Sequence, residues 1–109
     1  MKASDLIKGL PGEVLIREGL ADFQSRRCTV PACLVGMAQS RLRSAGLITG
    51  VVAHALPEPE WQLYRLLRDE GGDAYSRYNA LIRELVSFEQ ALDQRQSKQL
   101  KTETGKAQI

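Results

Sequence analysis

Residues 74–95 read AYSRYNALIRELVSFEQALDQR and contain the most regular hydrophobic pattern of this 109-residue chain. Apolar side chains recur there at intervals of three, four, three and four residues, at Tyr78, Leu81, Leu85, Phe88 and Leu92. This spacing places them along one face of a helix, as a seam that packs against a neighbouring helix. Ile82 and Val86 widen the seam. We therefore predict a helix from 74 to about 95.

The residues just before this helix predict a helical hairpin. The sequence PEPE at 57–60 favours a helix start, because proline does not continue an upstream helix and carboxylates suit the positive end of the helix dipole. A helix over 61–70 follows, with leucines on its inward stripe. Gly71 and Gly72 then break the chain, and Asp73 is the expected N-cap of the final helix.

Two more helices are expected in the first half of the chain. One runs from 11 to about 26, where the small residue Gly19 allows a close helix crossing. The second begins after Thr29, whose hydroxyl can cap the free backbone N–H groups. Because 30–38 is almost wholly apolar, we place this second helix at the centre of the core.

Shorter elements connect these helices. Weak turn signals occur at 4–8 and at 40–45, the latter closed by Gly46. Residues 47–56 are apolar without a clear period, so we expect an extended connection there. The fold class is therefore all-α: an irregular four-helix bundle of two linked helical hairpins over 1–95, with a flexible polar tail at 96–109.

Composition and charge exclude several classes of protein. An apolar fraction of 43% and a charged fraction of 26% are typical of a globular protein. A net charge of +2 is too small to argue for nucleic-acid binding by the whole domain. The longest uncharged runs are 28–40 and 44–57, each shorter than a bilayer span, so no membrane association is expected. Asp5 and Lys8 interrupt any apolar secretory leader, which favours a cytoplasmic location.

Few residues carry chemistry. Cys28 and Cys33 are five positions apart, which matches neither a zinc knuckle nor a CxxC redox pair, so both are expected to be reduced. We expect no metal and no cofactor. His54 is the single histidine and is expected to have a structural role. An enzyme using His54, a tyrosine and carboxylates in a cleft is therefore the weakest hypothesis.

The seam on the final helix has two interpretations. It is either the core of an intramolecular bundle or the contact face of a homodimer, since twofold dimers are the commonest soluble oligomers. The broad apolar arc of this helix favours the second interpretation. The preferred function is a non-enzymatic protein–protein interaction module that self-associates through the seam.

Two other groups are weaker candidates for sites. The alternative function is a small nucleic-acid-binding or regulatory protein with a basic patch made of Arg26, Arg27, Arg41 and Arg43. A possible ligand site near the Gly71–Gly72 turn consists of Tyr64, Tyr75, Arg77 and Asn79. For both groups, packing and helix capping are the competing explanation.

Residues 10–92 also resemble a group of small bacterial proteins for which no activity is assigned. The stretches that carry the resemblance are 10–12 (LPG) with 18–22 (EGLAD), 41–43 (RLR) with 46–47 (GL), and 76–83 (SRYNALIR) with 85–89 (LVSFE). The resemblance implies a bacterial cytoplasmic origin and no particular mechanism.

Overall fold

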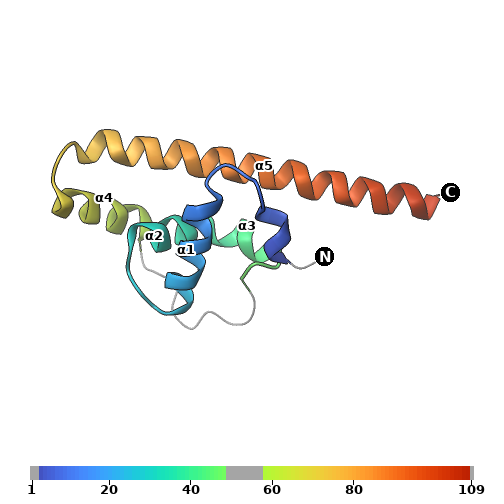
Figure 1. The fold of residues 1–109 in the computed structure, drawn as a ribbon, viewed down its shortest axis with the longest axis horizontal. Helices are drawn as coiled ribbons and strands as arrows, with labels where there is room; N and C mark the ends of the chain where they lie inside the picture. Colours follow the sequence, from blue (N-terminus) through green and yellow to red (C-terminus); the bar gives the residue numbers. More distant parts are fainter. Residues whose placement is uncertain (1–2, 49–57, 109) are drawn as a thin grey trace.

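The computed structural model describes residues 3–48 and 58–108, and all regular secondary structure in these two stretches is helical. A short 3₁₀-helix, η1 (Ala3–Ile7), precedes the α-helices (Figure 1). These are α1 (Glu13–Gln24), α2 (Val30–Met37), α3 (Gln39–Ser44), α4 (Pro59–Glu70) and α5 (Ala74–Gln108). The all-α fold class is therefore confirmed, and the short turns predicted at 4–8 and 40–45 correspond to η1 and α3.

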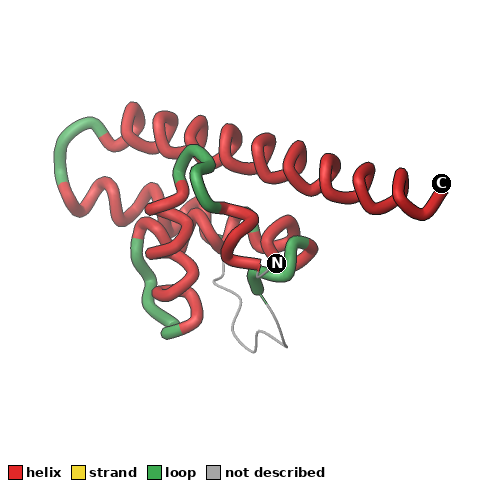
Figure 2. The backbone as a smooth tube through the Cα atoms, turned by 45° about the vertical axis from the view of Figure 1, so that its right-hand side comes forward, coloured by secondary structure: helices red, strands yellow, loops and turns green. Residues whose placement is uncertain are grey.

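The helices form two pairs, α1 with α2 and α4 with α5. α5 runs along one side of the molecule, and α4 lies beside the first turns of α5 (Figure 1 and Figure 2). The C-terminal part of α5 extends beyond the other helices. α2 contacts α1, α3 and α4, so it joins the two pairs. Its side chains from Ala32 to Val35 are buried. This confirms the prediction that α2 occupies the centre of the core.

Local side-chain hydrogen bonds start two of these helices. The Thr29 hydroxyl accepts a hydrogen bond from the Ala32 N–H at 3.2 Å, and it donates one to the Asp22 carboxylate at 2.8 Å. The Asp73 carboxylate accepts a hydrogen bond from the Ser76 N–H at 3.1 Å. Both predicted N-caps are confirmed, because each satisfies a backbone donor that the first helical turn leaves unpaired.

Helices α1 and α3 end with the same backbone motif. In each, the residue after the C-cap is left-handed, and the next N–H bonds a carbonyl five residues earlier. In α3 the left-handed residue is Gly46, with a φ of 81°. In α1 it is Arg26, with a φ of 62°. An arginine therefore occupies a conformation that glycine adopts more easily.

The helix boundaries differ from the predictions at the C-terminus. We expected the last helix to end near 95, whereas α5 continues to Gln108. The flexibility of 96–109 stays a prediction. The extended connection predicted over 47–56 lies almost entirely outside the described residues.

Candidate functional site

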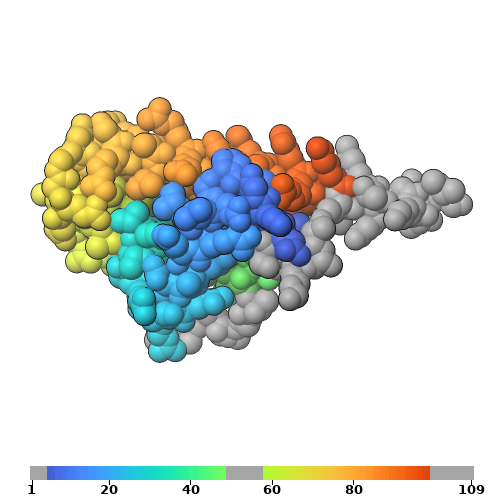
Figure 3. All heavy atoms as spheres, in the orientation of Figure 1, coloured from blue at the N-terminus to red at the C-terminus, as the bar shows by residue number. Residues whose placement is uncertain are grey.

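An apolar groove lies where α1 and the start of α2 meet the hairpin of α4 and α5. Figure 3 shows these two parts of the chain, blue to cyan and yellow to orange, side by side on one face of the molecule. The groove has a volume of about 460 Å³. Its apolar lining comes from Leu15, Val30, Pro31, Ala80 and Leu81, and its charged lining comes from Glu70 and Arg77. We call it the hairpin groove.

The α1 side of the groove is held by a close helix crossing. Gly19 of α1 lies against the backbone of Pro31, the second residue of α2. The Thr29 cap and its bond to Asp22 then fix the direction in which α2 begins. Val30 and Pro31 are thereby presented to the groove from a rigid helix start.

The charged part of the groove is a salt bridge between α4 and α5. The Arg77 guanidinium pairs with the Glu70 carboxylate, and both side chains are about half exposed. Exposed pairs of this kind contribute at most about 1 kcal/mol to folding stability. Among the described residues that line the groove, Glu70 is the one carboxylate, and it is paired with Arg77.

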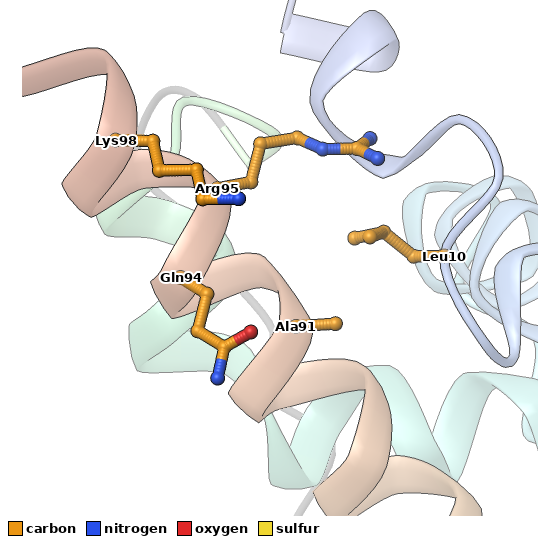
Figure 4. A pocket seen from close by; sticks show the side chains of 5 residues that line it. All are labelled: Leu10, Ala91, Gln94, Arg95 and Lys98. Atoms are coloured by element: carbon orange, nitrogen blue, oxygen red, sulfur yellow. The ribbon is translucent and has the colours of Figure 1, made fainter. Parts of the chain in front are cut away.

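A second, smaller pocket of about 210 Å³ lies between the N-terminal segment and α5 (Figure 4). Its lining consists of Leu10, Ala91, Gln94, Arg95 and Lys98. The Arg95 side chain crosses toward the N-terminal segment (Figure 4). Its Nη1 donates hydrogen bonds to the carbonyl oxygens of Leu6 at 2.8 Å and Lys8 at 2.7 Å. Arg95 therefore anchors the N-terminal segment to α5.

The predicted seam on α5 faces the interior of the chain. Leu85, Phe88 and Leu92 are buried, and Tyr78 and Leu81 are partly buried against the same core. The seam therefore packs within one molecule, as the intramolecular alternative expected. Leu81 is the member of the seam that also lines the hairpin groove. A role of the seam in contact with a partner stays a prediction.

The predicted ligand group does not come together as one site. Tyr64 packs edge-on against Tyr78, with ring centroids 5.9 Å apart. Tyr75 is 68% exposed. Because Tyr75 and Arg77 are two positions apart on a helix, their side chains point about 200° apart. Asn79 lies about 200° beyond Arg77 in turn, so Arg77 alone of the four reaches the hairpin groove.

The arginines predicted as a basic patch lie in two separate places. Arg26 and Arg27 precede α2, whereas Arg41 and Arg43 follow it on α3. A helix of eight residues, about 12 Å long, separates the two pairs. A nucleic-acid-binding role for these four residues stays a prediction.

Arg41 is already bound to the acidic side of α5. Its Nε lies 3.0 Å from Glu89 Oε2, and its Nη1 donates a hydrogen bond to the Asp93 carboxylate. Burial raises the pKa of Glu89, and the positive charge of Arg41 opposes that rise. Arg41 therefore links α3 to α5.

Sequence reasoning missed most of the hairpin groove. Leu15, Val30 and Pro31 were predicted as helix residues, and nothing in their spacing indicated that they meet Ala80. His54 lies outside the described residues. In the part of the chain that the structure describes, no cluster of three or more potential metal ligands occurs.

No family model matches the chain, and no curated protein or solved structure shows significant similarity to it. The resemblance to small bacterial proteins therefore stays an expectation. Over 3–48 and 58–108, none of the helices has the length and apolarity that crossing a bilayer requires.

Proposed function

We propose that the protein is a non-enzymatic interaction module that pairs with a second copy of itself through the hairpin groove. The observation that carries the proposal is an apolar groove, together with an exposed apolar side chain on α1 that adjoins one of the lining residues in sequence. Val14 adjoins Leu15 on α1 and is 69% exposed, whereas Leu15 lines the groove. Exposed apolar surface that is rimmed by polar groups is typical of protein-binding sites.

The occupant we favour is a second copy because a twofold contact must be complementary to itself. Such a patch needs a protruding group and a hollow on the same surface. We assign the protrusion to Val14, which is exposed on α1, and the hollow to the groove lining around Pro31 and Leu81. In the proposed dimer, each Val14 side chain enters the groove of the partner.

The charges at the groove favour the same arrangement. Glu70 and Arg77 carry opposite charges at the groove and are each about half exposed. A twofold operation can exchange their partners, so that Glu70 of one copy faces Arg77 of the other. Opposite charges at the rim favour correct pairing and add little affinity.

The test is sedimentation velocity of the full chain over a wide concentration range. We expect the wild-type protein to change from monomer to dimer as its concentration rises. Ala80→Glu should remain monomeric, because Ala80 is exposed in the groove and the new carboxylate must be desolvated in the contact. Ser87→Glu is the matched control, since Ser87 is exposed elsewhere on α5.

The outcomes separate clearly. Dimerisation of the wild type and of Ser87→Glu, with loss in Ala80→Glu, supports the proposal. A wild-type protein that is monomeric at every concentration contradicts it, as does an Ala80→Glu variant that dimerises as strongly as the control. Circular dichroism of the variants as monomers checks that both remain folded.

We also propose that the module acts in the cytoplasm. Cys28 and Cys33 are both free thiols. Reduced cysteines are typical of proteins in that compartment. Fractionation of cells that express the chain without added signals tests this location.

A further inference from the structure

The side of α4 that faces away from the core carries an aromatic ring and two arginines. Trp61, Arg65 and Arg68 are spaced by four and three residues, so they lie within about 60° of one another around the helix. All three side chains are exposed, and Trp61 is 60% exposed. Leu63 and Leu67, on the opposite side of α4, are completely buried. We call Trp61, Arg65 and Arg68 the α4 surface.

Arg65 is held over the ring of Trp61. Its guanidinium carbon lies 5.4 Å from the centroid of the indole ring, which is a cation–π contact. Its Nη2 also donates a hydrogen bond to Gln62 Oε1 at 2.6 Å. The Cys28 thiol donates a hydrogen bond to the same oxygen at 3.9 Å, so the segment before α2 adjoins the α4 surface. A positive charge is therefore fixed over one face of the indole.

The arginines of the α4 surface differ from those elsewhere in the chain. Arg17, Arg41 and Arg77 each form a salt bridge with a carboxylate. Within the two described stretches, neither Arg65 nor Arg68 is in a salt bridge, although Asp69 lies one turn from Arg65. Their charges are therefore available to an anionic ligand.

More positive charge follows from the segment beside the α4 surface. Arg27 directly precedes Cys28, and its side chain is 70% exposed. Its Nη1 lies 3.8 Å from Asp22 Oδ1, which is longer than a hydrogen bond. The positive charge next to Trp61 thus comes from two segments that are distant in the sequence.

We propose that the α4 surface binds single-stranded RNA, with an unpaired base stacked on Trp61 and neighbouring phosphates bound by Arg65 and Arg68. Exposed aromatic rings beside basic side chains are the combination that binds single strands without sequence preference. Arg65 covers one face of the indole, and the base stacks on the other. An acidic peptide would match the arginines but would leave the ring without a flat partner. RNA is favoured because its loops and ends present unpaired bases.

The test uses the fluorescence of Trp61, which is the one tryptophan of the chain and reports directly on the proposed site. The full chain is titrated with an oligouridylate of about 12 nucleotides at several salt concentrations. We expect saturable quenching, and an affinity that falls with salt by a slope of about 0.7 for each bound phosphate. Duplex RNA of the same length is the matched ligand and should bind roughly tenfold more weakly with little quenching, because its bases are already stacked and paired.

Three variants separate stacking from charge, with binding followed by the anisotropy of a labelled oligouridylate. Trp61→Leu should weaken binding roughly tenfold and leave the salt slope unchanged. Arg68→Gln should lower the salt slope by about 0.7. Arg83→Gln is the control, since Arg83 is exposed about 160° around α5 from buried Leu85, and it should bind like the wild type.

Three results would overturn the proposal. The first is an oligouridylate that leaves the fluorescence of Trp61 unchanged. The second is an equal response to duplex RNA or to polyglutamate, which would show that the surface recognises negative charge alone. The third is a folded Trp61→Leu variant, checked by circular dichroism, that binds as tightly as Arg83→Gln. The α4 surface is separate from the lining of the hairpin groove, so the result does not depend on whether the protein dimerises.

Discussion

Gly19 of α1 and Pro31 of α2 are in direct backbone contact. A Cβ atom built on Gly19 would lie 2.3 Å from the Pro31 carbonyl oxygen and 2.6 Å from Cγ2 of Val35. The crossing of α1 and α2 therefore requires a residue without a side chain at this position. This close crossing determines how deeply α2 is buried and where the α2 side of the hairpin groove lies.

Gly19→Ala should destabilise the protein even though alanine is the better helix former. Alanine gains about 1 kcal/mol of helix propensity. Separating the two helices costs roughly 1–3 kcal/mol or more, because backbone atoms at the contact cannot rotate away. Chemical denaturation measures the net loss. Glu18→Ala, on the exposed side of α1, is the control and should change little; equal stability of both variants would show that the crossing is loose.

Arg26→Gly should stabilise the protein. A left-handed conformation costs an ordinary residue roughly 1–2 kcal/mol, and glycine avoids this cost. Part of the stabilisation is lost, because glycine has more conformational freedom in the unfolded chain. We expect a net increase of about 0.5–1 kcal/mol in the free energy of unfolding, measured by thermal and chemical denaturation.

The left-handed residue at the end of α3, Gly46, allows the reverse substitution to be tested as a control. Gly46→Ala introduces a Cβ at a left-handed residue and should reduce stability by about 1 kcal/mol. A destabilised Arg26→Gly variant would mean that the arginine side chain makes contacts that outweigh the backbone strain.

Arg41→Met should raise the pKa of Glu89 further. Burial already holds this pKa above its ordinary value of 4.5, and Arg41 partly compensates. A carboxyl with a raised pKa binds its proton more tightly in the folded state. The free energy of unfolding therefore falls as the pH rises from the unfolded pKa to the folded one, and the fall should be larger in the variant. NMR titration of the Glu89 carboxyl measures the shift directly.

Arg77→Met is the control for this titration. Arg77 pairs with Glu70 and not with Glu89, so the Glu89 pKa should stay at its wild-type value. An unchanged Glu89 pKa in Arg41→Met would argue that the link between α3 and α5 is open in solution.

Arg95→Met should loosen the N-terminal segment. The substitution keeps an unbranched apolar side chain like the aliphatic stem of arginine, but it removes the donor to the carbonyls of Leu6 and Lys8. Hydrogen bonds from a charged donor in a partly exposed site contribute roughly 1–2 kcal/mol. Hydrogen exchange should become faster in residues 3–10. Gln94→Met, at the neighbouring exposed position, should leave exchange there unchanged, and a similar effect of both variants would contradict the role of Arg95.

Local sequence signals predicted most helices and two of their starts. The hydroxyl of Thr29 and the carboxylate of Asp73 act within one turn, so their effect depends on neighbouring backbone groups alone. The end of α5 could not be placed in this way, because 96–108 contains few apolar residues and no stop signal before Gly105.

The candidate sites were harder to predict than the helices. Periodicity identified Leu81, Leu85 and Phe88 as one face, but not whether the chain or a partner covers it.

The sequence by itself determined the positions of the helices, apart from the end of α5, and the central position of α2, because helix periods, caps and an all-apolar helix act through near neighbours and through burial. Only the tertiary structure decided that the seam of α5 is covered from within, and that Leu15, Pro31 and Ala80 share a groove. The physical reason is that contacts between distant segments depend on how closely helices approach, and here that approach is set by the missing side chain of Gly19.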